Sequence, residues 1–123
     1  MERVTGVGGV FFRAEDPEAL AAWYATHLGV DPAPAAYGRR SWWQEAGPTV
    51  FAAFEADTDY FGSRTQQVMI NFRVRDLDAM LAQLRAAGVE VIDAVEASEH
   101  GRFGWAVDPE GTRFELWEPP AGA

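Results

Sequence analysis

The sequence contains an internal repeat, and this repeat limits the folds that are open to the chain. Phe12 and Asp16 each have a counterpart 60 positions later, Phe72 and Asp76. Each half is predicted to form a strand, a helix and three further strands. Because such a unit cannot cover both faces of its own sheet, we expect the two modules to pair into one curved sheet with the helices outside. The alternative is a coincidence between two ordinary α+β segments.

This organisation predicts an α+β protein with a single domain over residues 1–123. The first module is expected at about 4–55 and the second at about 68–118. Residues 56–67 are polar, show no periodicity and are interpreted as a connector.

Both predicted helices have start and stop signals. Asp16 is a good N-cap and Pro17 suits the first helical position, while Gly29 suits the C-terminal end. Asp76 and Gly88 have the same roles in the second half. Large apolar side chains follow at helical spacing in each case. They are Leu20, Trp23, Tyr24 and Leu28 in the first helix, and Leu77, Met80, Leu81 and Leu84 in the second.

Strands are predicted where apolar residues cluster or alternate. The first half has these segments at 4–13, 40–44 and 49–55, with a loop or a short edge strand at 31–36, and the second half has them at 68–74 and 89–92. An acidic loop is expected to follow, before a hairpin. That hairpin contains the turn Asp108-Pro109-Glu110-Gly111, which has a favoured residue at each corner.

In the last predicted strand, Phe114 and Leu116 face one side of the sheet, while Glu115 and Trp117 face the other. An acidic residue at this position is either a solvated surface residue or part of a site. The net charge of −9 and the lack of any Lys or Arg block argue against nucleic-acid binding. No apolar run approaches the ~20 residues of a membrane helix. We expect a soluble, cytoplasmic protein, and the absence of cysteine excludes a disulfide framework.

On these motifs the chain resembles the vicinal oxygen chelate superfamily, which includes glyoxalase I, bleomycin-resistance proteins, fosfomycin-resistance enzymes and extradiol dioxygenases. The resemblance covers nearly the whole chain. It implies paired βαβββ modules that form a curved mixed sheet, a cup with the helices outside, usually in a homodimer. It does not imply one reaction, because the superfamily supports many. The motifs are Phe12-Arg13-Ala14-Glu15-Asp16, Leu28-Gly29, Phe72-Arg73-Val74-Arg75-Asp76-Leu77 and the segment from Asp108 to Leu116.

The resemblance also implies where a metal would bind. Metal-dependent members use one residue from the first strand and one from the last strand of each module. The matching positions here are Gly9, Met69, Glu115 and either Ala52 or Phe51. Only Glu115 offers a donor suited to a divalent cation. We therefore predict that the metal site is lost and that the protein has no cofactor.

Strand alternation predicts which residues face the interior of the cup. Glu115 is the candidate catalytic or ligand-binding carboxylate, and His100, in the loop before the hairpin, is a weaker candidate for acid–base chemistry. The expected ligand-binding residues are Phe11, Trp42, Val50, Phe54, Met69, Asn71, Trp105 and Trp117. Trp42 and Trp43 are adjacent and must face opposite sides of a strand, in an order that the sequence leaves open. Each aromatic residue could equally be ordinary packing.

Two functions follow from this pattern. The first is a metal-free binding protein of the glyoxalase/bleomycin-resistance type, which holds a small organic molecule that is aromatic and can be cationic. The second is an enzyme, a lyase, isomerase or dioxygenase, that uses a divalent metal or acid–base chemistry by Glu115. The missing metal ligands, the five tryptophans and the acidic balance favour the first.

Overall fold

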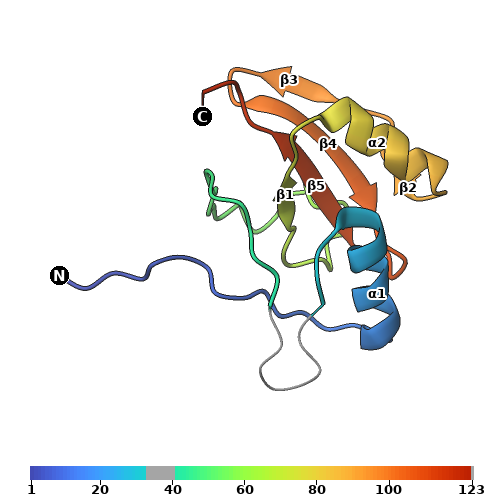
Figure 1. The fold of residues 1–123 in the computed structure, drawn as a ribbon, viewed down its shortest axis with the longest axis horizontal. Coiled ribbons are helices and arrows are strands. Elements are labelled where there is room, and N and C mark those ends of the chain that lie inside the picture. Colours follow the sequence, from blue (N-terminus) through green and yellow to red (C-terminus); the bar gives the residue numbers. More distant parts are fainter. Residues whose placement is uncertain (33–40, 123) are drawn as a thin grey trace.

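The computed structural model describes residues 1–32 and 41–122, in which a mixed sheet packs against two helices (Figure 1). The strand order is β1-β5-β4-β2, and β3 pairs with β4 outside this path. The β1–β5 pair is parallel, and the other pairs are antiparallel. This confirms the predicted α+β class. The elements are α1 (Pro17–Leu28), β1 (Asn71–Arg73), α2 (Leu77–Ala86), β2 (Glu90–Val91), β3 (Glu96–Ser98), β4 (Gly101–Val107) and β5 (Arg113–Glu118).

Both helices begin where the sequence predicts. The side chain of Asp16 accepts a hydrogen bond from the N–H of Ala19 at 3.1 Å, and Asp76 accepts one from Ala79 at 3.0 Å. Helix α1 ends at Gly29, whose φ of 71° lies in the left-handed region that favours glycine. Both predicted helices are therefore confirmed.

Glutamates from the C-terminal hairpin add a second cap to each helix. Glu110 accepts hydrogen bonds from the N–H groups of Glu15 and Asp16, just before α1. Glu118 accepts one from Leu77 at 2.9 Å, at the start of α2. Negative charge is favourable at both places because unpaired N–H groups make a helix N-terminus partly positive.

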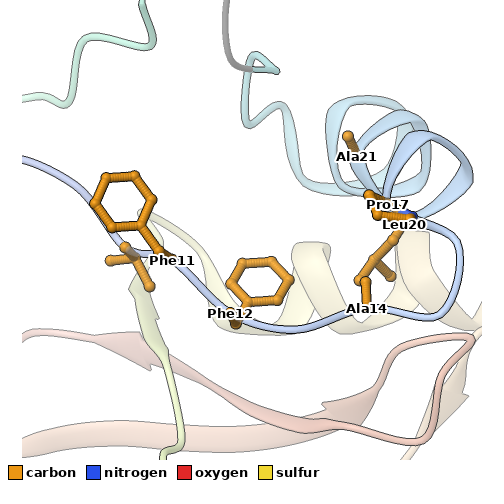
Figure 2. A pocket seen from close by; sticks show the side chains of 7 residues that line it. Phe11, Phe12, Ala14, Pro17, Leu20 and Ala21 are labelled. Atoms are coloured by element: carbon orange, nitrogen blue, oxygen red, sulfur yellow. The ribbon is translucent and has the colours of Figure 1, made fainter.

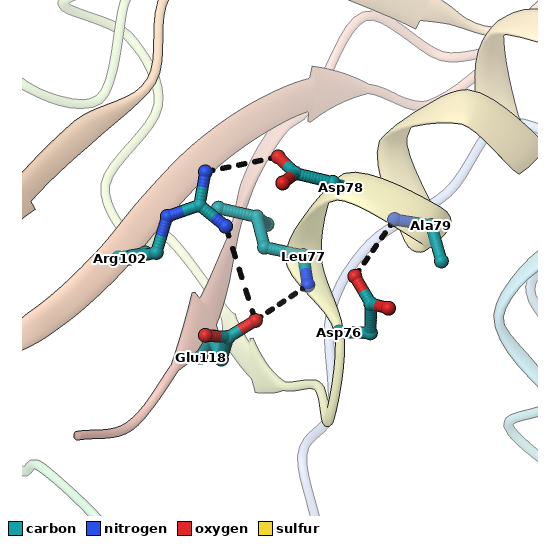
Figure 3. Close-up of polar contacts among 6 residues, drawn as sticks. All are labelled: Asp76, Leu77, Asp78, Ala79, Arg102 and Glu118. Carbon is teal, nitrogen blue, oxygen red and sulfur yellow. Dashed lines mark hydrogen bonds and ion pairs between the residues drawn. The ribbon is translucent and has the colours of Figure 1, made fainter. Parts of the chain in front are cut away.

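Figure 3 shows how the cap on α2 is held in place. The guanidinium of Arg102 lies between Glu118 and Asp78, and its Nη2 donates to Asp78 at 2.9 Å. This hydrogen bond lowers the pKa of the exposed Asp78 carboxyl. The helix start is thereby connected to β4 and β5.

The core lies between the helices and one face of the sheet. Phe114 and Leu116 of β5 are buried there and Glu115 faces the opposite side, as the alternation predicts. The same core receives residues from both helices, so the two halves of the chain share it. Its other members are Leu20, Tyr24, Leu77, Leu81, Leu84 and Ala106.

Two predictions in the second half need correction. The strand expected at 68–74 is limited to Asn71–Arg73, in which Phe72 packs against the core and Asn71 bonds to Glu115 on the other face. The acidic loop before the hairpin contains the short strand β3, which pairs with β4. Acidic side chains are compatible with this strand because all three of its residues are exposed.

The strands expected in the first half are absent from the described residues, and those predictions are wrong. Residues 4–13, 41–44 and 49–55 form no strand, and residues 33–40, including most of the segment at 31–36 and the start of the strand predicted at 40–44, lie outside the described part. The N-terminal segment extends away from the sheet (Figure 1). A strand requires a partner for its backbone N–H and C=O groups, and no strand of the described residues pairs with these segments. Large apolar side chains are consequently exposed, including Phe11 at 95% and Phe51 at 94%.

The N-terminal segment, through Val10, Phe11 and Phe12, forms an apolar hollow against α1. Figure 2 shows Phe11 and Phe12 on one side of it and Leu20 and Ala21 of α1 on the other. No residue that contacts Glu115 lines this hollow. Within the described residues, neither helix is long and apolar enough to cross a membrane.

Candidate functional site

The candidate site is centred on Glu115, in the middle of β5. Strand register places Asn71 of β1 on one side of it and Trp105 of β4 on the other. All three side chains lie on the face of the sheet opposite the helices. The Glu115 residue is only 6% exposed, so its carboxylate needs partners from the protein.

Three side-chain donors bind this carboxylate. The amide of Asn71 donates to Oε1 at 2.7 Å. The indole N–H of Trp105 donates to Oε2 at 2.9 Å, and the phenol of Tyr60 donates to the same oxygen at 2.5 Å. Hydrogen bonds to an ionised group are among the stronger ones in proteins. The carboxylate is therefore held in one orientation.

Tyr60 was not identified from the sequence, because it lies in the polar connector. Its own N–H bonds to Oγ1 of Thr58, in a local turn. Gln66 fastens the connector to β5: its amide donates to the carbonyl of Arg113 at 2.7 Å and accepts from the Arg113 N–H at 2.9 Å. The one available signal was the pair Tyr60-Phe61, two adjacent aromatic residues within an otherwise polar segment.

Burial and the adjacent carboxylate keep the Tyr60 phenol protonated. Burial raises its pKa above the ordinary value, and the hydrogen bond to Glu115 raises it further. The charge of Glu96, on β3, acts in the same direction. The phenol consequently remains a hydrogen-bond donor to Glu115 throughout the physiological range of pH.

Aromatic rings surround the carboxylate. Phe54 stacks on Tyr60 with ring centroids 5.4 Å apart, and Tyr60 meets Trp105 edge-on at 6.0 Å. Phe103 and Trp117, opposite each other on β4 and β5, are parallel at 6.2 Å. We use the name aromatic face for Asn71, Glu115 and the five rings of Phe54, Tyr60, Phe103, Trp105 and Trp117.

The residues of the aromatic face differ in their exposure to solvent. Asn71 and Phe54 are exposed, and Tyr60 and Phe103 are half-buried. Trp105 and Trp117 are buried, as is Glu115. A ligand would therefore meet the first four residues before it met the carboxylate.

The structure thus brings four of the predicted ligand-binding residues into this site: Phe54, Asn71, Trp105 and Trp117. Met69 lies two residues before Asn71 and is half-buried. The expectation that Phe11, Trp42 and Val50 join them is not met, because they are exposed on segments that form no strand.

His100 does not face the carboxylate. Its imidazole is 76% exposed and lies 3.7 Å from Glu99. Only its backbone takes part, since the carbonyl of His100 accepts the indole N–H of Trp117 at 2.8 Å. The geometry gives this residue a structural role in positioning Trp117.

The side chains do not fit the divalent metal that the superfamily resemblance implies. Glu115, the single donor among the implied positions, already accepts three hydrogen bonds. Gly9 and Ala52 have no donor side chains and lie on segments without strands. Among the residues that the structure describes, no group of three or more His, Cys, Asp or Glu side chains could hold a metal ion.

Comparisons with solved structures agree with this fold. TnmS3, an antibiotic binding protein from Streptomyces sp. CB03234, is 24% identical, with 97% of this chain and 99% of that chain covered and a TM-score of 0.65. Lactoylglutathione lyase from Agrobacterium tumefaciens is 15% identical, with 95% and 96% covered and a TM-score of 0.60. A glyoxalase-related enzyme from Fulvimarina pelagi is 23% identical, with 95% and 90% covered and a TM-score of 0.55.

At these identities the likeness establishes the fold alone. None of the curated proteins compared with this chain matches it. The model of the glyoxalase-like domain, however, matches residues 9–117, which is most of the sequence. The chain therefore belongs to the glyoxalase-like domain family, within the vicinal oxygen chelate superfamily.

Proposed function

We propose that the protein binds a small aromatic molecule, which can be cationic, on the aromatic face, and that it does so without a metal ion. The observation that carries this proposal is the Glu115 carboxylate, buried and held by three donors among aromatic rings. Stacking surfaces with a few fixed polar groups are the usual form of a small-molecule site.

Two further observations support binding. TnmS3, which has the same fold over nearly its whole length, is described as an antibiotic binding protein. The net charge of −9 also favours the approach of a cation over that of an anion.

The donor set supports the metal-free part of the proposal. A divalent cation at Glu115 would have to replace the N–H and O–H donors that now surround the carboxylate, and the described residues supply no second ligand cluster. The same arrangement favours binding over acid–base catalysis, because both carboxylate oxygens are occupied by protein donors.

We also propose that the protein works as a homodimer. In the part of the chain that the structure describes, the first-half segments form no strand and expose apolar residues such as Phe11 and Phe51, and the hollow beside α1 is lined entirely by apolar side chains. In the second half, β1 pairs with β5, and Phe72 packs against the core. A second copy of the chain is the partner whose segments have the matching length and apolar pattern, and pairing would remove the exposed apolar surface.

Binding can be tested with 1-naphthylmethylammonium, a planar ring with one cationic group, by isothermal titration calorimetry. We expect binding at one site per chain. Phe103→Leu should weaken it about three- to tenfold, since an aromatic contact contributes about 0.5–1.5 kcal/mol. Phe72→Leu is the matched control, because Phe72 lies next to β5 on the opposite, core-side face. Equal effects of the two substitutions, or no binding at all, would contradict the proposal.

A further inference from the structure

The aromatic face uses its hydrogen-bond donors internally. The phenol of Tyr60, the indole of Trp105 and one amide N–H of Asn71 all donate to Glu115. The indole N–H of Trp117 donates to the carbonyl of His100. A tyrosine hydroxyl and a tryptophan indole have one hydrogen each, so three of these four residues have no donor left for a ligand.

Acceptors remain on the same face. A phenol oxygen that donates its hydrogen keeps two lone pairs, and the nearby indole N–H of Trp105 can occupy only one of them. Tyr60 is half-buried, whereas Glu115 is 6% exposed, so a ligand meets the Tyr60 side chain before it meets the carboxylate. Donation to a carboxylate also polarises the phenol and makes its oxygen a better acceptor. Asn71 contributes its carbonyl oxygen and a second N–H.

We propose that Tyr60 is the specificity-determining residue of the aromatic face: its oxygen accepts a hydrogen bond from the ligand and selects planar aromatic ligands that carry an N–H donor. Glu115 is then a positioning residue, because it holds the phenol hydrogen and acts on the ligand through Tyr60. This inference rests on the proposed binding function and defines the ligand class within it.

Charged groups of both signs lie around the aromatic face, so the preference between anionic and cationic ligands has to be argued. Arg73 lies opposite Trp117 in the β1–β5 register, and Arg113 lies two residues before Glu115 on β5. Either guanidinium could attract an anionic ligand instead. Their guanidinium groups donate to the carbonyls of Glu45 and Tyr60, at 3.0 and 3.4 Å. The carboxylates of Glu115 and Glu96 act on the Tyr60 phenol itself. The proposal therefore predicts that cationic donors are preferred despite the two arginines.

The test uses three probes that share one ring system: 1-naphthylmethylammonium, 1-naphthylacetate and 1-methylnaphthalene. Calorimetry with the full-length protein should show the ammonium probe binding at least about tenfold more tightly than the acetate probe, the effect expected of one hydrogen bond with a charged partner. In Tyr60→Phe this preference should fall to about threefold or less. The uncharged 1-methylnaphthalene should bind both proteins within about twofold.

Tyr24→Phe is a matched control. It also removes a phenol that donates to a buried carboxylate, that of Asp108, but on the core side of the sheet. All three proteins have the same net charge, so general attraction of the cation is constant among them. The preference should therefore persist in Tyr24→Phe.

The outcomes separate the two proposals. If no probe binds, both the binding function and this inference fail. If the probes bind but the acetate probe binds as tightly as the ammonium probe, the binding function survives and the inference fails. A Tyr60→Phe protein with an unchanged preference, or with tighter binding of the ammonium probe, would also overturn it, the latter because the phenol would then be competing with the ligand for Glu115.

Discussion

Tyr24 on helix α1 donates a hydrogen bond of 2.7 Å to Oδ2 of Asp108, the first residue of the turn between β4 and β5. The other oxygen of this carboxylate accepts the backbone N–H groups of Glu110 and Thr112. Asp108 is 5% exposed, so water cannot replace these partners readily. The turn therefore connects the sheet to α1 as well as reversing the chain.

Replacing Tyr24 by phenylalanine should destabilise the protein by about 1–3 kcal/mol, the cost of leaving a buried acceptor without its donor. Chemical denaturation would measure the change. Glu110→Gln is a suitable comparison, because Glu110 is exposed and its loss of charge at the start of α1 should cost less than about 1 kcal/mol. A larger loss for Glu110→Gln than for Tyr24→Phe would contradict this account of the turn.

Stability should depend on pH in the alkaline range. Burial and hydrogen bonds to Asp108 and Glu115 raise the pKa values of Tyr24 and Tyr60 above the ordinary value of about 10. The folded state therefore holds these protons more tightly than the unfolded state. Their contribution is fully present below about pH 10 and is lost as the pH rises further, because the unfolded chain then releases protons that the folded chain keeps.

This dependence can be measured as the free energy of unfolding between pH 8 and 11.5. The double substitution of Tyr24 and Tyr60 by phenylalanine should make the decline above pH 10 shallower. An identical decline in the wild-type and doubly substituted proteins would show that other groups cause it.

Glu115→Gln should lower both stability and ligand discrimination. Donors approach the carboxylate from two sides, Asn71 at Oε1 and Tyr60 with Trp105 at Oε2. The amide has only one acceptor oxygen, so its NH₂ group must face a donor on one side, at a cost of about 1–3 kcal/mol. The preference for 1-naphthylmethylammonium over 1-naphthylacetate should also fall about tenfold.

A fold that survives Glu115→Gln, seen by circular dichroism, is required to interpret this result. Loss of stability with an unchanged preference would assign Glu115 a structural role only.

Purified protein prepared without chelator should contain no stoichiometric divalent metal. Glu115 alone among the implied ligand positions offers a suitable donor, and that carboxylate is bound by protein groups. Elemental analysis would measure the content. A metal at near one equivalent per chain, removable together with ligand binding, would refute the metal-free proposal.

In solution the protein should have the mass of a homodimer. Light scattering at micromolar concentration would show it, and Phe51→Glu should shift the mass towards that of the monomer, because Phe51 is 94% exposed in the single chain. Glu99→Gln, at an exposed polar position, provides a control for a surface change of charge. A monomeric wild-type protein would contradict the proposed pairing.

The local structure of the second half could be predicted from sequence alone. Asp76 and Leu77 predicted the start of helix α2. The Asp108 turn and the alternation after it predicted that Phe114 lies in the core and Glu115 on the opposite face. Caps, turns and strand alternation depend on interactions between near neighbours in the chain. Short sequence motifs specify such interactions, and here the caps, the turn and the alternation of β5 form as predicted.

Other features depended on contacts between distant residues. Tyr60 reaches Glu115, which is 55 positions away, because Gln66 attaches the connector to β5. No local pattern in a polar loop specifies such a contact. The first-half segments show the converse: their apolar composition suits a strand, but a strand forms only where a partner offers its backbone groups. Local physics was thus enough for the helices and the hairpin, whereas tertiary structure decided which donors surround Glu115 and whether the described first-half segments form strands.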